Sequence, residues 1–211
     1  MKEFDKLPEW KEYSFTYAGI GSRDIRFIKE PTMKIDMAEA MKFIAGILEQ
    51  SGYTLNSGGA KGSDSAFESG VTKDSMKNIF YASSANERTR AIAKEIHPAP
   101  HMLSGYILDL MARNTYQIFG KDLDTPVDFV LCYTKDGCEH HSQRTRETGG
   151  TGQAIEMASR KGIPVINMAN KNWEQKVYAI MNEALKTKKE NKPKAIHVTI
   201  SEPTKQAKRK R

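Results

Sequence analysis

The chain has 211 residues, 38% of them hydrophobic, with two cysteines and a formal net charge of +7 at pH 7. This length suits one α/β domain with a full core, and two cysteines exclude a disulfide framework. No apolar run approaches the roughly 20 residues that cross a bilayer, and the first residues lack the layout of a signal peptide, so we expect a cytoplasmic protein with no membrane contact.

Apolar periodicity and turn signals predict strands that alternate with helices along the chain. In chain order we expect a strand over 15–18, a helix over 35–50, a strand over 53–56, a helix from Ser63, a strand over 78–81, helices over 87–96 and 103–119, a strand over 127–133, a loop over 134–147, a helix over 152–161, a strand over 164–167 and a helix over 173–186. Parallel strands require an intervening element, which here is helical. The alternation predicts an α/β protein, namely a three-layer Rossmann-like fold with a mainly parallel sheet.

The positive charge is concentrated at the end of the sequence. Residues 186–211 contain ten Lys or Arg and two Glu, so the other residues together carry a charge of about −1. A basic segment binds a polyanion through counterion release, but solvated basic tails are common, and both interpretations stay open. We expect one domain over 1–190 and a basic C-terminal tail over 191–211, in which 195–200 is a candidate edge strand.

Three glycine-rich turns follow predicted strands, at 18–23, 57–64 and 148–152. Such turns expose backbone N–H groups and a helix N-terminus, which favour an anion, and parallel sheets bind ligands beyond the carboxyl ends of their strands. The turns therefore predict a site for a phosphate-bearing ligand. Its candidate residues are Gly19, Gly21, Ser22, Arg23, Ser57, Gly58, Gly59, Asp64, Gly149, Gly150, Thr151 and Gly152. The glycines also suit tight turns and Asp64 suits a helix cap, so these structural roles stay open.

The first two turns carry a resemblance to a known family. The sequences AGIGSR at 18–23 and GYTLNSGGAKGSD at 52–64 resemble the SLOG superfamily, the Rossmann-like fold shared by the DNA-processing protein DprA/Smf and the LOG nucleotide hydrolases. Within this superfamily the chain looks most like the small DprA-like proteins that bacteriophages often encode. The resemblance covers residues 17–167. It implies a nucleotide or single-stranded DNA as partner, leaves a homo-oligomer open, and implies neither cofactor nor metal.

The third turn resembles the other branch of the same superfamily. LOG enzymes carry the signature P-G-G-x-G-T-x-x-E, and this chain reads TGGTGQAIE over 148–156, without the Pro and the second Thr. The LOG enzymes also place an Arg-Lys pair on a preceding helix, where Arg113 matches and Asn114 does not. The resemblance implies that Arg113 and Glu156 are catalytic residues that cleave the N-glycosidic bond of a nucleoside 5′-monophosphate. The residues alone leave a structural alternative open for both: Glu156 as an ordinary exposed helical residue, and Arg113 as the ion-pair partner of a neighbouring carboxylate.

Three functions follow from these observations. The first is a protein that binds a nucleotide or single-stranded nucleic acid, and the second is a LOG-like phosphoribohydrolase. The third is a sensor or sponge that binds a nucleotide signal without chemistry. A metal site is not expected, because the spacing of Cys132, Cys138, His140 and His141 fits no common zinc pattern.

Overall fold

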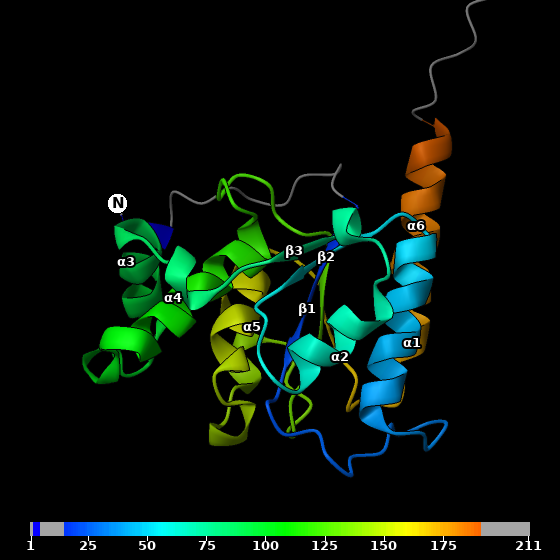
Figure 1. The fold of residues 1–211 in the computed structure, drawn as a ribbon, viewed down its shortest axis with the longest axis horizontal. Coiled ribbons are helices and arrows are strands. Elements are labelled where there is room, and N and C mark those ends of the chain that lie inside the picture. Colours follow the sequence, from blue (N-terminus) through cyan, green and yellow to red (C-terminus); the bar gives the residue numbers. More distant parts are fainter. Residues whose placement is uncertain (1, 5–14, 191–211) are drawn as a thin grey trace, which may run out of the picture.

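The computed structural model describes residues 2–4 and 15–190, which form a central sheet between two layers of helices (Figure 1). Its strands are β1 (Thr16–Gly21), β2 (Thr54–Ser57), β3 (Lys77–Ile79), β4 (Phe129–Tyr133) and β5 (Val165–Asn167). All neighbouring pairs are parallel, in the order β3-β2-β1-β4-β5. The three-layer fold predicted from the sequence is confirmed. The predicted basic tail over 191–211, with its candidate strand, lies outside the described residues.

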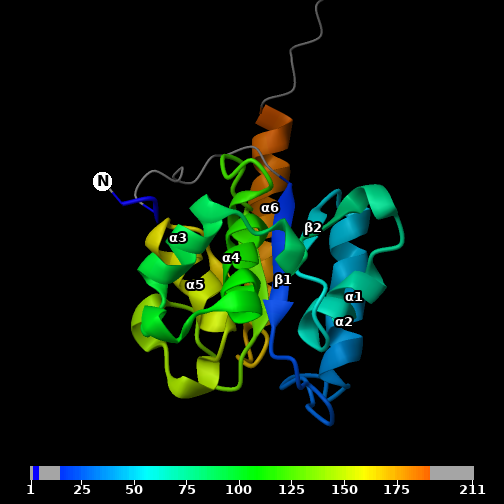
Figure 2. The same cartoon turned by 60° about the vertical axis from the view of Figure 1, so that its left-hand side comes forward.

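In the part of the chain that the structure describes, three helices cover each face of the sheet. The helices are α1 (Met37–Gln50), α2 (Ser63–Gly70), α3 (Glu87–Ile96), α4 (Gly105–Phe119), α5 (Thr151–Arg160) and α6 (Trp173–Glu190). Short 3₁₀ helices cover Asp74–Met76, Ala82–Ser84, Pro100–Met102, His141–Gln143 and Arg146–Thr148. Figures 1 and 2 show α1, α2 and α6 on one face and α3, α4 and α5 on the other. Among the described residues, no helix combines the length and apolar character that crossing a membrane requires.

The strand residues alternate between two cores. Tyr17 of β1 and Leu131 of β4 are fully buried with α1, α2 and α6, whereas Ala18 and Val130 are fully buried with α3, α4 and α5. Successive side chains of a strand point to opposite faces, so a sheet covered on both faces needs apolar residues at every position. This requirement explains the unbroken apolar sequence of β4.

The first strand is longer than the sequence predicts. β1 continues through Gly19 to Gly21, so Gly19 lies inside the strand and not in a turn. A Cβ atom at Gly19 would lie 2.7 Å from Leu55 Cδ1 and 2.9 Å from Phe67 Cγ. Gly19 is therefore needed for close packing of β1 against its neighbours, and this packing accounts for it without a ligand.

The sheet reverses its strand order next to β1. The chain passes from β1 outward to β2 and β3, and then crosses to β4 and β5 on the other side of β1. Loops that leave the carboxyl ends of β1 and β4 therefore diverge and open a crevice between them. Ligands of doubly wound sheets bind in such crevices.

Candidate functional site

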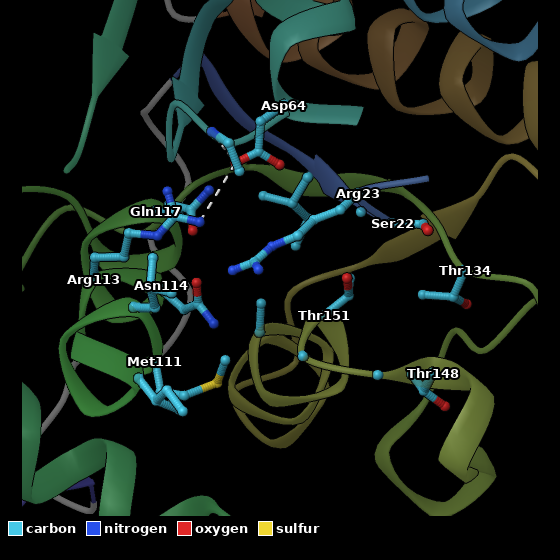
Figure 3. A pocket seen from close by; sticks show the side chains of 18 of the residues that line it. Ser22, Arg23, Asp64, Met111, Arg113, Asn114, Gln117, Thr134, Thr148 and Thr151 are labelled. Atoms are coloured by element: carbon cyan, nitrogen blue, oxygen red, sulfur yellow. Dashed lines mark hydrogen bonds and ion pairs between the residues drawn. The ribbon is translucent and has the colours of Figure 1, made fainter. Parts of the chain in front are cut away.

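A cavity of about 490 Å³ lies at the carboxyl ends of β1 and β4 (Figure 3). Its walls come from the ends of these two strands, the loop before α2, one side of α4, and the turn that begins α5. Eight of the predicted site residues line it: Gly21, Ser22, Arg23, Asp64, Arg113, Gly149, Gly150 and Thr151. The volume falls within the range of about 300–1,000 Å³ that is typical of small-molecule sites.

Arg23 supplies an exposed positive charge to this cavity. Figure 3 shows its side chain extending from the end of β1 toward the space between α4 and α5. Within the part of the chain that the structure describes, Arg23 forms no ion pair, whereas Arg26 of the same loop is paired with Asp24 at 3.0 Å. Arg23 is therefore available to an anion in this cavity.

Arg113 is a second cation in the cavity, and it is buried. It lies on α4, and its Nη2 atom is 3.8 Å from Asp64 Oδ2, a contact drawn as a dashed line in Figure 3. Its Nε atom has no hydrogen-bond partner among the described residues. Burial lowers the pKa of Arg113, opposed by Asp64, and burial raises the pKa of Asp64 to about 6, opposed by Arg113. The buried pair therefore leaves the Nε–H donor of Arg113 unsatisfied.

Gly58 leaves space for the Arg113 side chain. A Cβ atom at Gly58 would lie 2.0 Å from Arg113 Nη1. The guanidinium group therefore packs directly on the backbone of the second turn. This contact gives Gly58 a role that the sequence analysis did not foresee.

Three amides of the second turn, those of Gly58, Gly59 and Ala60, are bound by side chains of α2 and are not free for a ligand, contrary to the sequence prediction. The N–H groups of Gly58 and Ala60 donate to Asp64 Oδ2 over 3.2 and 3.4 Å. The N–H group of Gly59 and the hydroxyl of Ser57 both donate to Glu68 Oε1, over 3.1 and 2.5 Å. Side chains of α2 thus occupy the positions that an anion would take. Asp64 binds the turn and Arg113, and it is not the N-cap of α2, which is Gly62.

The third turn does present free amides to the cavity. Gly149, Gly150 and Thr151 line it at the N-terminus of α5. Within the described residues, the N–H groups of Gly150 and Thr151 have no acceptor. Free N–H groups at a helix N-terminus attract anions. Of the three turns, the third therefore fits the sequence prediction best.

Asp136 holds the third turn in place. Its carboxylate accepts hydrogen bonds from the hydroxyls of Thr134, Thr145 and Thr148 over 2.7, 2.6 and 2.5 Å. Burial opposes ionisation of Asp136, but these donors outweigh it and lower its pKa to about 2. Because Thr134 follows β4 and Thr148 precedes Gly149, one carboxylate fixes both ends of the intervening loop.

Glu156 lies outside the cavity, so the structure does not bring the predicted catalytic pair together. Its carboxylate is paired with Arg144 and with Arg160. Gly152 serves the same cluster, since a Cβ atom there would lie 2.7 Å from Arg144 Nε. Glu156 and Gly152 thus organise α5 and the loop before it, whereas Arg113 faces the cavity.

One wall of the cavity was missed by the sequence analysis. α4 contributes Ile107, Leu110 and Met111 as apolar contacts, and Asn114 and Gln117 as polar ones. Gln117 Nε2 is buried without a hydrogen-bond partner among the described residues. The signal was an excess of apolar positions on α4, which cover more than one face of a single helix.

A second cavity of about 470 Å³ adjoins the first. The two share Arg23, Ala60, Leu110 and Arg113. The second cavity is lined further by Gly58, Gly59, Lys61, Tyr81, Ala82, Ser83 and Tyr106. Two arginines therefore stand at the boundary between two open spaces of similar size.

Fold and site together define a doubly wound α/β protein with a cavity at the point where its strand order reverses, and the charged residues that line this cavity are Arg23, Arg113, Asp64 and Glu147. Within the described residues, no group of three or more His, Cys, Asp or Glu is placed to hold a metal ion. Searches of protein-family models, of curated proteins and of solved structures find no match to this chain.

Proposed function

We propose that this protein binds a nucleotide, or a nucleotide unit of a single-stranded nucleic acid, through its phosphate group. The observation that carries the proposal is that Arg23, Arg113 and the free amides of Gly150 and Thr151 all face one cavity. Two guanidinium groups and a helix N-terminus favour an oxyanion over a neutral ligand. The resemblance of the turns to the SLOG superfamily supports the same ligand class.

The α4 wall of the cavity suits the nucleoside part of such a ligand. Ile107, Leu110 and Met111 provide apolar surface, and Asn114 and Gln117 provide amide groups. Apolar walls with a few polar groups are typical of small-molecule sites. A sugar and base would pack against α4 while the phosphate contacts the arginines.

The arrangement supports binding more strongly than N-glycosidic cleavage. Cleavage through the Arg113–Glu156 pair would need the Glu156 carboxylate at the ligand, but Arg144 and Arg160 hold it outside the cavity. A general base must lie within hydrogen-bond reach of its proton, so this placement gives Glu156 no catalytic contact. A binding protein or a nucleotide sensor needs no such carboxylate.

Isothermal titration calorimetry with adenosine and thymidine 5′-monophosphates tests the proposal, using the matched variants Arg23→Gln and Arg26→Gln. We expect Arg23→Gln to weaken binding about tenfold or more, because it removes a charge-assisted contact to phosphate. Arg26→Gln removes the same charge from the same loop outside the cavity and should leave affinity unchanged. Absence of binding by the unmodified protein, or an equal loss in both variants, would refute the proposal.

A further inference from the structure

The second cavity has the chemistry of a base-binding surface beside a phosphate site. Its lining includes three cationic side chains, Arg23, Lys61 and Arg113, and no carboxylate among the described residues. It also includes Tyr81 and Tyr106, which are 56% and 69% exposed. Exposed aromatic rings beside cationic side chains are the combination that binds unpaired bases along a phosphate backbone.

The Tyr81 ring is held in position by the second glycine turn. A Cβ atom at Gly59, whose φ is +67°, would lie 2.9 Å from Tyr81 Cε1. The ring therefore packs on the Gly59 backbone while more than half of the residue stays open to solvent. A ring fixed before binding loses little conformational freedom when a base stacks on it.

Tyr106 adds a second aromatic side chain to this surface. It lies in the first turn of α4, one helix turn from Leu110, which lines both cavities. Seven residues further along α4, Arg113 lines both cavities as well. The arginine pair thus has open space on both of its sides: the first cavity, with the apolar residues Ile107 and Met111, and the second cavity, with the two tyrosines.

We propose that the two cavities together bind a phosphodiester with a nucleoside on each side, that is, a dinucleotide unit. The phosphate lies at Arg23 and Arg113, one nucleoside packs in the first cavity against Met111, and the second stacks on Tyr81 and Tyr106. This inference rests on the proposed function, since it takes the phosphate contact at the arginines as given. It adds that a mononucleotide fills only half of the site. A free dinucleotide and a step within a longer single strand share this chemistry.

The test compares two ligands that differ only in the second nucleoside. Thymidylyl-(3′→5′)-thymidine and thymidine 3′-methylphosphate carry the same phosphodiester charge, and calorimetry gives the affinity of the full chain for each. We expect the dinucleotide to bind about tenfold more tightly, because stacking of one base on aromatic side chains supports a gain of this size. In the Tyr81→Ala/Tyr106→Ala variant this advantage should vanish while the affinity for thymidine 3′-methylphosphate stays the same.

Two control variants separate stacking from folding. Tyr81→Phe/Tyr106→Phe keeps both rings and should keep the tenfold advantage. Tyr178→Ala removes another exposed tyrosine, on α6 at the opposite face of the sheet, and should change nothing. Thermal unfolding monitored by circular dichroism checks that the alanine variant is folded. If it is not, the inference is decided by the unmodified protein, from its affinities for the dinucleotide and for thymidine 3′-methylphosphate.

The outcomes distinguish this inference from the proposed function. Equal affinity for the two ligands, or an equal loss of both in the alanine variant, overturns the dinucleotide inference and leaves phosphate binding intact. Failure of both ligands and of the mononucleotides to bind overturns both proposals. Deca-thymidylate then shows whether the natural ligand is a single strand or a free dinucleotide. If deca-thymidylate binds more tightly than its number of dinucleotide steps explains, the ligand is a single strand. If there is no such gain, the ligand is a free dinucleotide.

Discussion

At the scale of single residues, the glycines of the second turn serve side chains of the chain itself. Gly58 gives space to Arg113 and Gly59 gives space to Tyr81. Three amides of the same turn are bound by Asp64 and Glu68. The turn thus supports two side chains that would contact a ligand.

Gly58→Ala should weaken nucleotide binding with little effect on stability. The new Cβ atom would displace Arg113 Nη1, but this atom ends a flexible side chain and the φ angle of Gly58 is not in the left-handed region. We expect about a tenfold loss of affinity, which corresponds to one charge-assisted hydrogen bond, and a change in unfolding free energy of about 1 kcal/mol or less. Calorimetry and urea unfolding measure the two quantities.

Gly46→Ala is the control for Gly58→Ala. Gly46 lies inside α1, and a Cβ atom there would meet the Gly70 carbonyl oxygen at an ordinary distance of 3.5 Å. This substitution should stabilise the protein by about 0.5–1 kcal/mol, because alanine favours the helix, and leave binding unchanged. Unchanged affinity in Gly58→Ala would show that Arg113 does not contact the ligand.

At the scale of elements, the placement of the third turn depends on the loop that follows β4. Asp136→Asn should disturb this loop. Three hydroxyl groups donate to the two carboxylate oxygens of Asp136, whereas an asparagine amide has only one acceptor oxygen. We expect a loss of about 1–3 kcal/mol in unfolding free energy and weaker nucleotide binding. Asp122→Asn is the control: Asp122 also accepts hydrogen bonds from a threonine in a turn, but outside both cavities. It should affect stability alone.

The contribution of Asp136 to stability should also depend on pH. Its pKa is lowered to about 2 in the folded protein, below the ordinary value of 3.8, so the folded state binds the proton less readily than the unfolded state. The stabilisation is therefore complete above about pH 4 and is lost as the pH falls toward 2. The difference in unfolding free energy between the unmodified protein and Asp136→Asn should shrink over this interval. A constant difference would contradict the assigned role.

The same elements show what the sequence could and could not predict. The helix over 87–96 is found as predicted, because its apolar period and its Asn86 cap are local signals. Whether an amide is free is not a local signal: three amides of the second turn are occupied because Asp64 and Glu68, several residues later, fold back on them. Likewise, Glu156 is held outside the cavity by an ion pair with Arg144, which lies in the segment that the sequence predicts only as a loop.

At the scale of the whole molecule, positive charge is divided between a local site and a tail. The chain outside 186–211 carries a charge of about −1, yet the boundary of its two cavities holds two arginines. A compact ligand with one phosphate would respond mainly to these arginines. A long polyanion would respond to the basic tail as well, because counterion release grows with each phosphate that is neutralised.

Deletion of 203–211 should therefore reduce the salt dependence of binding for long ligands only. The deletion removes five Lys or Arg and no acidic residue, and each cation that contacts a phosphate of a single strand contributes about 0.7 to the slope of log affinity against log salt concentration. For deca-thymidylate we expect the slope to fall by up to about 3.5, and for thymidine 5′-monophosphate we expect no change. Replacing the same five residues by Gln keeps the chain length and should reproduce the effect. An unaltered slope for deca-thymidylate would assign the tail a solvating role, whereas equal losses for both ligands would place its charges near the cavity.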